Sequence, residues 1–137
     1  MTAPSSGPSG PATLQAAILA QAADAIIFAD RQGVVRLWNR GAETAFGYSA
    51  AEALGRELDF IIPERLRPAH NAGYERAIAS GQVRNAGRAV TTRAVGKGGA
   101  RLYMAMSFSL VKDASGAVLG AVAIGRLSPP PACADPA

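Results

Sequence analysis

The stretch WNRGAETAFGY (residues 38–48) marks the change from a strand to a helix in the first third of this chain. Asn39 suits the N-cap position because its side-chain oxygen can accept a hydrogen bond from a free amide of the first helical turn. Gly47 breaks the pattern that follows. We therefore expect a short helix over residues 40–46, directly after a strand that ends at Trp38.

A β-hairpin is expected upstream of this stretch. Residues 25–29 (AIIFA) predict a buried strand, and residues 34–38 (VVRLW) predict its partner. The turn between them, residues 30–33, ends in Gly33, where a positive φ is needed. Before the hairpin, residues 13–23 predict a short amphipathic helix, whose apolar residues at helical spacing are Leu14, Ile18 and Leu19.

Helical signals continue downstream and then give way to strands. Ser49 and Glu52 form a capping-box pattern for a helix over residues 50–54. Pro63 is typical of a first helical position, and this longer helix is expected to run to Ser80, with Pro68 making its first turn kinked or separate. Strands are then expected over residues 88–95, 102–111 and 118–124.

This order predicts an α+β domain, with a five-stranded antiparallel sheet and the helices gathered on one face. Such a domain can enclose one small ligand between sheet and helices. By composition, residues 12–127 form a single folded domain with the residue 13–23 helix at its N-terminal flank. Residues 1–11 and 128–137 are tails rich in small residues and proline, which we expect to be disordered.

Charge and composition narrow the function further. The net charge of +4 is spread over 137 residues without a basic run, which argues against a nucleic-acid surface. The single cysteine, Cys133, cannot form an internal disulfide, which fits a reducing compartment. No apolar run approaches the roughly 20 residues that span a bilayer, and no signal peptide is apparent. We expect a cytoplasmic protein with no membrane contact.

The order and spacing of these motifs resemble those of the PAS domain family. Residues 24–33 look like its opening hairpin, and residues 38–48 are similar to its strand-to-helix signature. Residues 49–55 and 113–125 resemble its following helix and its closing hairpin. The resemblance covers almost the whole folded unit, and it implies the PAS fold and a role in signal transduction.

Within that family, residues 61–70 (IIPERLRPAH) resemble the haem-binding sensors. These are the rhizobial oxygen-sensor kinases and the direct-oxygen-sensor phosphodiesterases, in which a histidine at the place of His70 is the proximal iron ligand. His70 is the only histidine here. The resemblance implies haem b, with His70 as the metal ligand, and a sensor of O2, CO, NO or redox state that signals through protein contacts.

Further pocket residues follow from the haem hypothesis. Tyr74 lies one helical turn from His70. Met104, Met106 and Phe108 alternate on the expected strand 102–111 and share a face, and either methionine could be a sixth iron ligand, although packing is the simpler role. The remaining candidates are aliphatic walls and cations that could pair with haem propionates, namely Ile78, Ile124, Arg67, Arg76 and Arg84.

The distal side departs from those sensors. Their distal arginine falls here on Val90, and the distal methionine of the phosphodiesterase type falls on Arg88. Arg88 is therefore the candidate donor to bound gas. Which gas binds, and what the sixth ligand is, stays open.

Two other functions remain. The chain could be a haem-free PAS module for interaction and dimerisation, holding another small molecule, a non-covalent flavin, or nothing. An enzyme, such as a haem peroxidase, ranks last because no acid–base pair, catalytic triad or phosphate-binding loop is visible. A homodimer is expected, since the helix over residues 13–23 is too short to be stable alone and needs a surface to pack on. The protein that receives the signal is not identifiable from the sequence.

Overall fold

The computed structural model describes residues 11–84 and 86–130. Of the expected tails, residues 1–10 and 131–137, with Cys133, lie outside the described residues, whereas Pro11 is the first residue of a helix. The elements follow the predicted order, and their bounds are α1 Pro11–Gln21, β1 Ala25–Asp30, β2 Val35–Trp38, α2 Arg40–Phe46, α3 Ala50–Ala53, η1 Leu58–Ile61, η2 Glu64–Leu66, α4 Arg67–Ser80, β3 Val90–Val95, η3 Lys97–Gly99, β4 Arg101–Lys112 and β5 Val118–Leu127.

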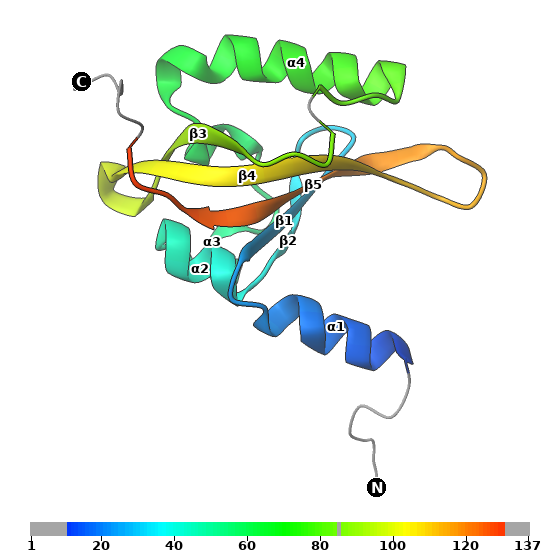
Figure 1. Ribbon diagram of the computed structural model, residues 1–137, viewed down its shortest axis with the longest axis horizontal. Helices are drawn as coiled ribbons and strands as arrows, with labels where there is room; N and C mark the ends of the chain where they lie inside the picture. The colour runs from blue at the N-terminus through cyan, green and yellow to red at the C-terminus, as the bar shows by residue number, and fades with distance from the viewer. Residues whose placement is uncertain (1–10, 85, 131–137) are drawn as a thin grey trace, which may run out of the picture.

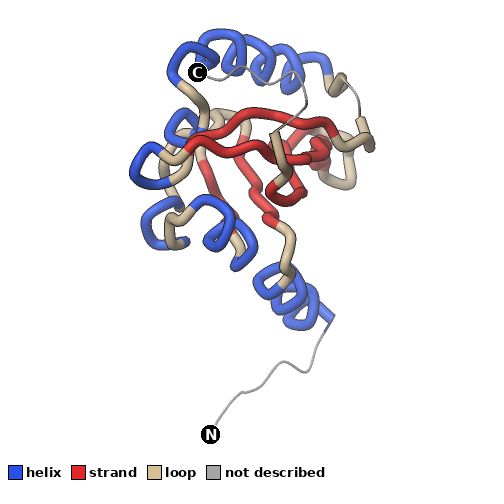
Figure 2. The backbone as a smooth tube through the Cα atoms, turned by 60° about the vertical axis from the view of Figure 1, so that its left-hand side comes forward, coloured by secondary structure: helices blue, strands red, loops and turns tan. Residues whose placement is uncertain are grey.

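The five strands form one antiparallel sheet in the order β2-β1-β5-β4-β3, so β5 joins the N-terminal hairpin to the C-terminal strands. Figure 1 shows α4 lying along one side of β3, β4 and β5, and Figure 2 shows the strands as one continuous layer with the helices outside it. Residues paired directly across an antiparallel ladder point to the same face. Ile27 pairs with Ala123, and Ala123 pairs with Phe108, so these three side chains share the inner face.

The helical segments cover this inner face, as the sequence predicts. Ala42 and Phe46 of α2 are buried in one apolar cluster with Ile27 of β1. The Trp38 ring packs 5.3 Å from the ring of Phe46, centroid to centroid, and its indole nitrogen donates a hydrogen bond to the carbonyl of Tyr48. These residues belong to one closed apolar core, which also includes Met104 of β4.

Asn39 holds the strand-to-helix junction together. Its Oδ1 accepts from the amide of Ala42, which is the expected N-cap bond, and also from the amide of Ile26. Its Nδ2 donates to the carbonyls of Leu19, Ala22 and Asp24. One buried side chain thus fixes both the start of α2 and the segment that leads out of α1.

The longer helix begins later than predicted. Pro63 has an extended ψ of 139°, and a short 3-10 turn, η2, separates it from α4. Pro68 then falls in the first turn of α4, where its missing N–H has no intrahelical partner to lose. The separate first turn that the sequence predicts is confirmed, whereas the start of the helix at Pro63 is wrong. Gly81 ends α4 in the left-handed conformation, as expected.

Smaller differences concern the strand ends and α1, which begins and ends two residues earlier than the predicted helix over residues 13–23. β4 and β5 extend beyond their predicted limits, and β3 begins two residues after Arg88. In Figure 1, α1 projects away from the sheet. None of the helices in residues 11–84 and 86–130 combines the length and the apolar character that a membrane crossing requires.

Candidate functional site

An apolar cavity of about 240 Å³ lies between α4 and the inner face of the sheet. Its walls are almost entirely aliphatic or aromatic, and they are contributed by β1, η1, α4, β3, β4 and β5. The lining residues are Ile27, Ala29, Leu58, Ile61, Ile62, His70, Gly73, Tyr74, Ala77, Ile78, Val83, Thr92, Arg93, Ala94, Met106, Phe108, Leu110, Ala121, Val122 and Ala123.

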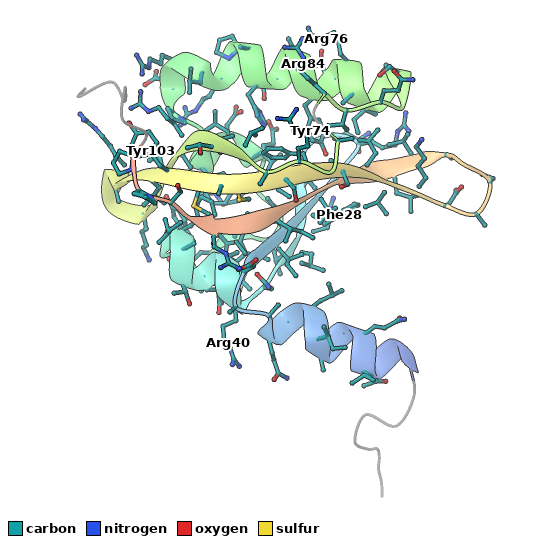
Figure 3. All side chains as sticks on the ribbon, in the orientation of Figure 1. Phe28, Arg40, Tyr74, Arg76, Arg84 and Tyr103 are labelled. Carbon is teal, nitrogen blue, oxygen red and sulfur yellow. The ribbon has the colours of Figure 1, made fainter. Side chains whose placement is uncertain are left out.

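One stripe of α4 forms the helical wall of this cavity. His70, Gly73, Tyr74, Ala77 and Ile78 recur at intervals of three and four, so they share one face of the helix. Figure 3 shows Tyr74 between α4 and the strands, whereas Arg76 lies on the outer side of the helix. The structure therefore brings together three of the predicted site residues, His70, Tyr74 and Ile78.

His70 is half-buried and stands where two hollows meet. Besides the apolar cavity it borders a polar cleft, which is also lined by Tyr74 and by the carboxylates of Glu57, Asp59 and Glu75. His70 Nδ1 lies 3.4 Å from Asn71 Oδ1. With the proton on Nδ1, this contact leaves the Nε2 lone pair available to a metal.

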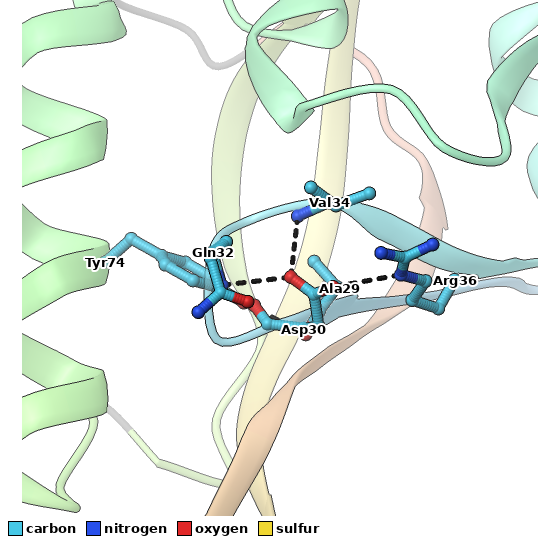
Figure 4. A network of polar contacts seen from close by, with 6 residues as sticks. All are labelled: Ala29, Asp30, Gln32, Val34, Arg36 and Tyr74. Atoms are coloured by element: carbon cyan, nitrogen blue, oxygen red, sulfur yellow. Dashed lines mark hydrogen bonds and ion pairs between the residues drawn. The ribbon is translucent and has the colours of Figure 1, made fainter.

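Tyr74 connects α4 to the sheet. Its ring lies 6.2 Å from the His70 ring with an interplanar angle of 30°. Its hydroxyl donates to the carbonyls of Ala29, at 3.0 Å, and Asp30, at 2.6 Å, as Figure 4 shows. Burial raises the pKa of Tyr74 to about 12, and the nearby negative charge of Asp30 adds to the rise. At neutral pH the phenol is therefore a hydrogen-bond donor.

The raised pKa of Tyr74 predicts how the stability of the domain changes at high pH. Because the folded pKa of Tyr74 exceeds the reference value of 10.0, its contribution to stability is complete below pH 10 and is lost as the pH rises through about 12. In an ultraviolet titration of the three tyrosines, we expect Tyr74→Phe to remove the phenol that ionises near pH 12. An unchanged high-pH step in the variant would show that another tyrosine produces it.

Only some of the predicted apolar residues of the sheet line the cavity. Met106 and Phe108 line the cavity. Met104 shares their face but is packed into the closed core, 1% exposed, and does not reach the cavity. Ile124 lies on the opposite face of the sheet and is 39% exposed. The expected placement of Ile124 in the pocket is corrected because the neighbouring Ala123, paired with Phe108, occupies the inward position.

The predicted cations also differ in position. Arg76 and Arg84 line a surface groove that shares Gly73, Ala77 and Val83 with the cavity. Arg67 does not line the cavity, and its Nε donates a hydrogen bond to the carbonyl of Ile62. Arg88 is exposed in the segment before β3 and does not line the cavity, which corrects its expected position. Val90, at the place where the haem-binding sensors have their distal arginine, pairs with Met106 and points to the same face of the sheet.

Most of the remaining wall was not predicted. Ile61, Ile62 and Leu110 carry an apolar signal in the sequence, but nothing in it distinguishes a cavity wall from ordinary core. The small residues Ala29, Ala77, Ala121 and Ala123 carry no signal of their own. They matter because short side chains on both walls leave the space between α4 and the sheet.

Comparison with known proteins gives the family. The family model described as PAS fold matches residues 19–126. The sensor protein FixL of Bradyrhizobium diazoefficiens is 36% identical over 53 residues, which is 39% of this chain and 10% of FixL. An uncharacterised protein of Azorhizobium caulinodans is 34% identical over 67 residues, 48% of this chain and 9% of that protein. The chain thus spans about a tenth of these curated relatives.

Solved structures agree on the fold. The crystal structure of a PAS domain from Colwellia psychrerythraea superposes with a TM-score of 0.74 at 21% identity, over 87% of this chain and 98% of that one. An RNA-binding light-oxygen-voltage receptor gives 0.67 at 27% identity, over 90% of this chain and 35% of the receptor. The family model and these structures therefore agree that the chain has the PAS fold. The chain belongs to the PAS family.

Proposed function

We propose that this PAS domain binds haem b in the cavity beneath α4, with His70 as the iron ligand, and senses a diatomic gas or the redox state. The observation that carries the proposal is the position of His70. It is the only histidine of the chain, and it borders an apolar cavity from the helix that closes that cavity. A neutral imidazole on an apolar wall is a common protein ligand for haem iron. Similarity to FixL, a sensor protein, supports the same assignment.

The chemistry of the walls fits a porphyrin. Apart from His70 and Tyr74 on α4 and Thr92 and Arg93 on β3, the α4 stripe and the sheet wall present aliphatic and aromatic surface. The groove that carries Arg76 and Arg84 adjoins the cavity along Gly73, Ala77 and Val83. Guanidinium groups at this edge would pair with haem propionates. When bound, haem supplies reversible gas binding at its iron, and the chain supplies the ligand, the apolar walls and these cations.

The volume of the cavity favours a second candidate. Pockets for drug-sized ligands start at roughly 300 Å³, and this cavity holds about 240 Å³. A porphyrin therefore requires α4 to move outward from the sheet, whereas a smaller apolar molecule does not. The second candidate is a haem-free PAS sensor for such a molecule. Non-covalent flavin remains a further option, since light-oxygen-voltage proteins share the fold.

A haemin titration separates these candidates. Purified protein is titrated with haemin and followed by absorption, and we expect a Soret band that saturates at one haem per chain. A competing titration with flavin mononucleotide should give no shift of the flavin spectrum. A protein that takes up no haemin, or that binds flavin instead, contradicts the haem proposal.

The two methionines of β4 provide a matched pair of substitutions to test the cavity wall that faces His70. His70 on α4 and Met106 on β4 belong to facing walls of the cavity, whereas Met104 does not line it. A Cβ at Gly125 would lie 2.6 Å from Met106 Sδ, so the glycine leaves room for the thioether. A methionine thioether that bound haem iron together with a histidine would raise the reduction potential of the iron.

We therefore expect Met106→Leu to convert haem-loaded ferrous protein from a six-coordinate to a five-coordinate absorption spectrum and to lower its reduction potential. Met104→Leu, which changes the same residue type on the same strand, should leave both unchanged. Absorption spectra and a redox titration of the two variants test this. A wild type that is already five-coordinate would contradict it.

We propose a homodimer as the state in which the domain signals. Asn39 binds three carbonyls around the end of α1 and so fixes the direction in which α1 leaves the domain. Leu19 then faces its own domain in a cleft with Trp38, while Leu14 and Ile18 are 58% and 59% exposed. The outer face of the sheet is also apolar, with Ile124 and with Phe28, which Figure 3 shows on the side away from α4.

A charge on the outer side of α1 tests this assembly. We expect wild type to be a dimer in light scattering and Ile18→Asp to be a monomer, because an aspartate cannot enter an apolar interface without a large desolvation cost. Gln15→Asp adds the same charge at a position that is already polar, and it should remain dimeric. Equal masses for wild type and Ile18→Asp would place the interface elsewhere.

A further inference from the structure

The hydroxyl of Tyr74 makes contacts that are not needed to fill the wall of the cavity. Its ring belongs to the cavity wall next to His70, but its hydroxyl passes beyond the cavity to the backbone of β1. Ala29 and Ala121 are paired directly opposite each other in the sheet, and both line the cavity. Their short side chains leave the phenol access to the main chain. A phenylalanine would fill the same wall and make no hydrogen bond.

The Tyr74 hydroxyl is bonded to a turn that is itself one hydrogen-bonded unit. The carbonyl of Asp30 accepts from both the Tyr74 hydroxyl and the amide of Gly33. The Asp30 carboxylate accepts from the amides of Gln32, at 2.9 Å, and Val34, at 3.1 Å. Its other oxygen accepts from Arg36 Nε at 2.9 Å. Apart from the Gly33 amide, which it does not draw, Figure 4 shows these contacts as a single network from α4 to β2.

The charges in this network keep it intact at physiological pH. Partial burial raises the pKa of Asp30, but hydrogen bonds from the Arg36 side chain and the turn amides outweigh it and hold the pKa below its ordinary value. Asp30 is therefore ionised and Tyr74 is protonated near pH 7. The Tyr74 hydroxyl therefore joins α4 to the β1–β2 turn at this pH.

We propose that Tyr74 is the positioning residue that joins α4 to the β1–β2 turn and carries a change at His70 to that turn. That a ligand binds at His70 rests on the proposed function. The contact between Tyr74 and the β1–β2 turn, which we call the joint, does not. His70 and Tyr74 are one helical turn apart with their rings facing, so movement of the first moves the second. From Asp30, β1 leads back to the segment that Asn39 binds at the end of α1. The path therefore ends at the apolar helix that we assign to the dimer.

Amide hydrogen exchange of the full chain tests the joint. Tyr74→Phe keeps the ring and removes the hydroxyl, and Tyr103→Phe is the matched control because Tyr103 does not line the cavity. In haem-free protein we expect exchange at Gln32, Gly33 and Val34 to rise roughly two- to tenfold in Tyr74→Phe, the size expected for one hydrogen bond. Tyr103→Phe should match wild type at these amides. Unchanged exchange in Tyr74→Phe overturns the proposal.

The second arm uses haemin as the probe. Addition of haemin should change exchange at these three amides in wild type and in Tyr103→Phe. In Tyr74→Phe, compared at a haemin concentration that gives the wild-type Soret absorbance, the change at the turn should be lost. A turn that still responds to haemin in Tyr74→Phe overturns the joint. If wild type takes up no haemin, the proposed function fails, and the haem-free comparison then decides the role of Tyr74 by itself.

Discussion

Asn39→Ala is expected to destabilise the domain by at least about 3 kcal/mol, because it leaves several buried backbone groups without partners at once. Asn39 is 4% exposed and makes five hydrogen bonds, two through Oδ1 and three through Nδ2. Each buried polar group that loses its partner costs roughly 1–3 kcal/mol. Since small domains are stable by only about 5–15 kcal/mol, the loss is a large fraction of the total.

Thermal unfolding measures this effect. For a domain of this size we expect the melting temperature to fall by roughly 10 °C or more. Asn71→Ala is the control, since Asn71 is exposed on α4 and its side chain makes one long contact, to His70. It should change stability by no more than about 0.5 kcal/mol. A small and equal effect of the two substitutions would show that water replaces the contacts of Asn39.

Asn39 also shows what sequence can predict. The cap of α2 and the capping box of Ser49 and Glu52 are local, so their residues identify them directly. The strand order and PAS topology follow from the order of such segments together with the family resemblance. The bonds from Asn39 to the end of α1 span up to 20 residues, and no local pattern announces them.

The site shows where sequence reasoning reaches its limit. The alternation of Met104, Met106 and Phe108 correctly places them on one face, but it does not locate the cavity along the strand. The haem hypothesis places Ile124 in the pocket wall, but Ala123 is the residue paired with Phe108, so Ile124 points to the opposite face of the sheet. The bond from Tyr74 to Ala29 joins residues 45 positions apart. Only the tertiary structure brings those groups together.

The second large effect concerns the proposed iron ligand. His70→Gly removes the imidazole and leaves space on the wall of the cavity, next to Gly73 on the same helical face. Loss of an outer-shell partner alone typically lowers metal affinity by about 10–100-fold, so loss of the ligand itself should cost at least about 100-fold in haem affinity. Added imidazole can enter the vacated space and supply the missing nitrogen.

Ala72→Gly is the matched control for this variant. It introduces the same helix-weakening residue two positions further along α4, at an exposed side chain that lines neither of the hollows beside His70, and it keeps the contact between His70 and Asn71. Both variants lose helix propensity by roughly 1 kcal/mol, so a difference between them in haem binding reports the imidazole rather than the helix. Circular dichroism of the two haem-free variants checks that they are equally folded.

Titration of His70→Gly with haemin, with and without imidazole and followed at the Soret band, tests most directly whether His70 holds haem iron. We predict a weak or absent band without imidazole, recovery of the wild-type band with it, and wild-type binding by Ala72→Gly throughout. Haemin binding by His70→Gly with the affinity and spectrum of wild type would contradict the assignment.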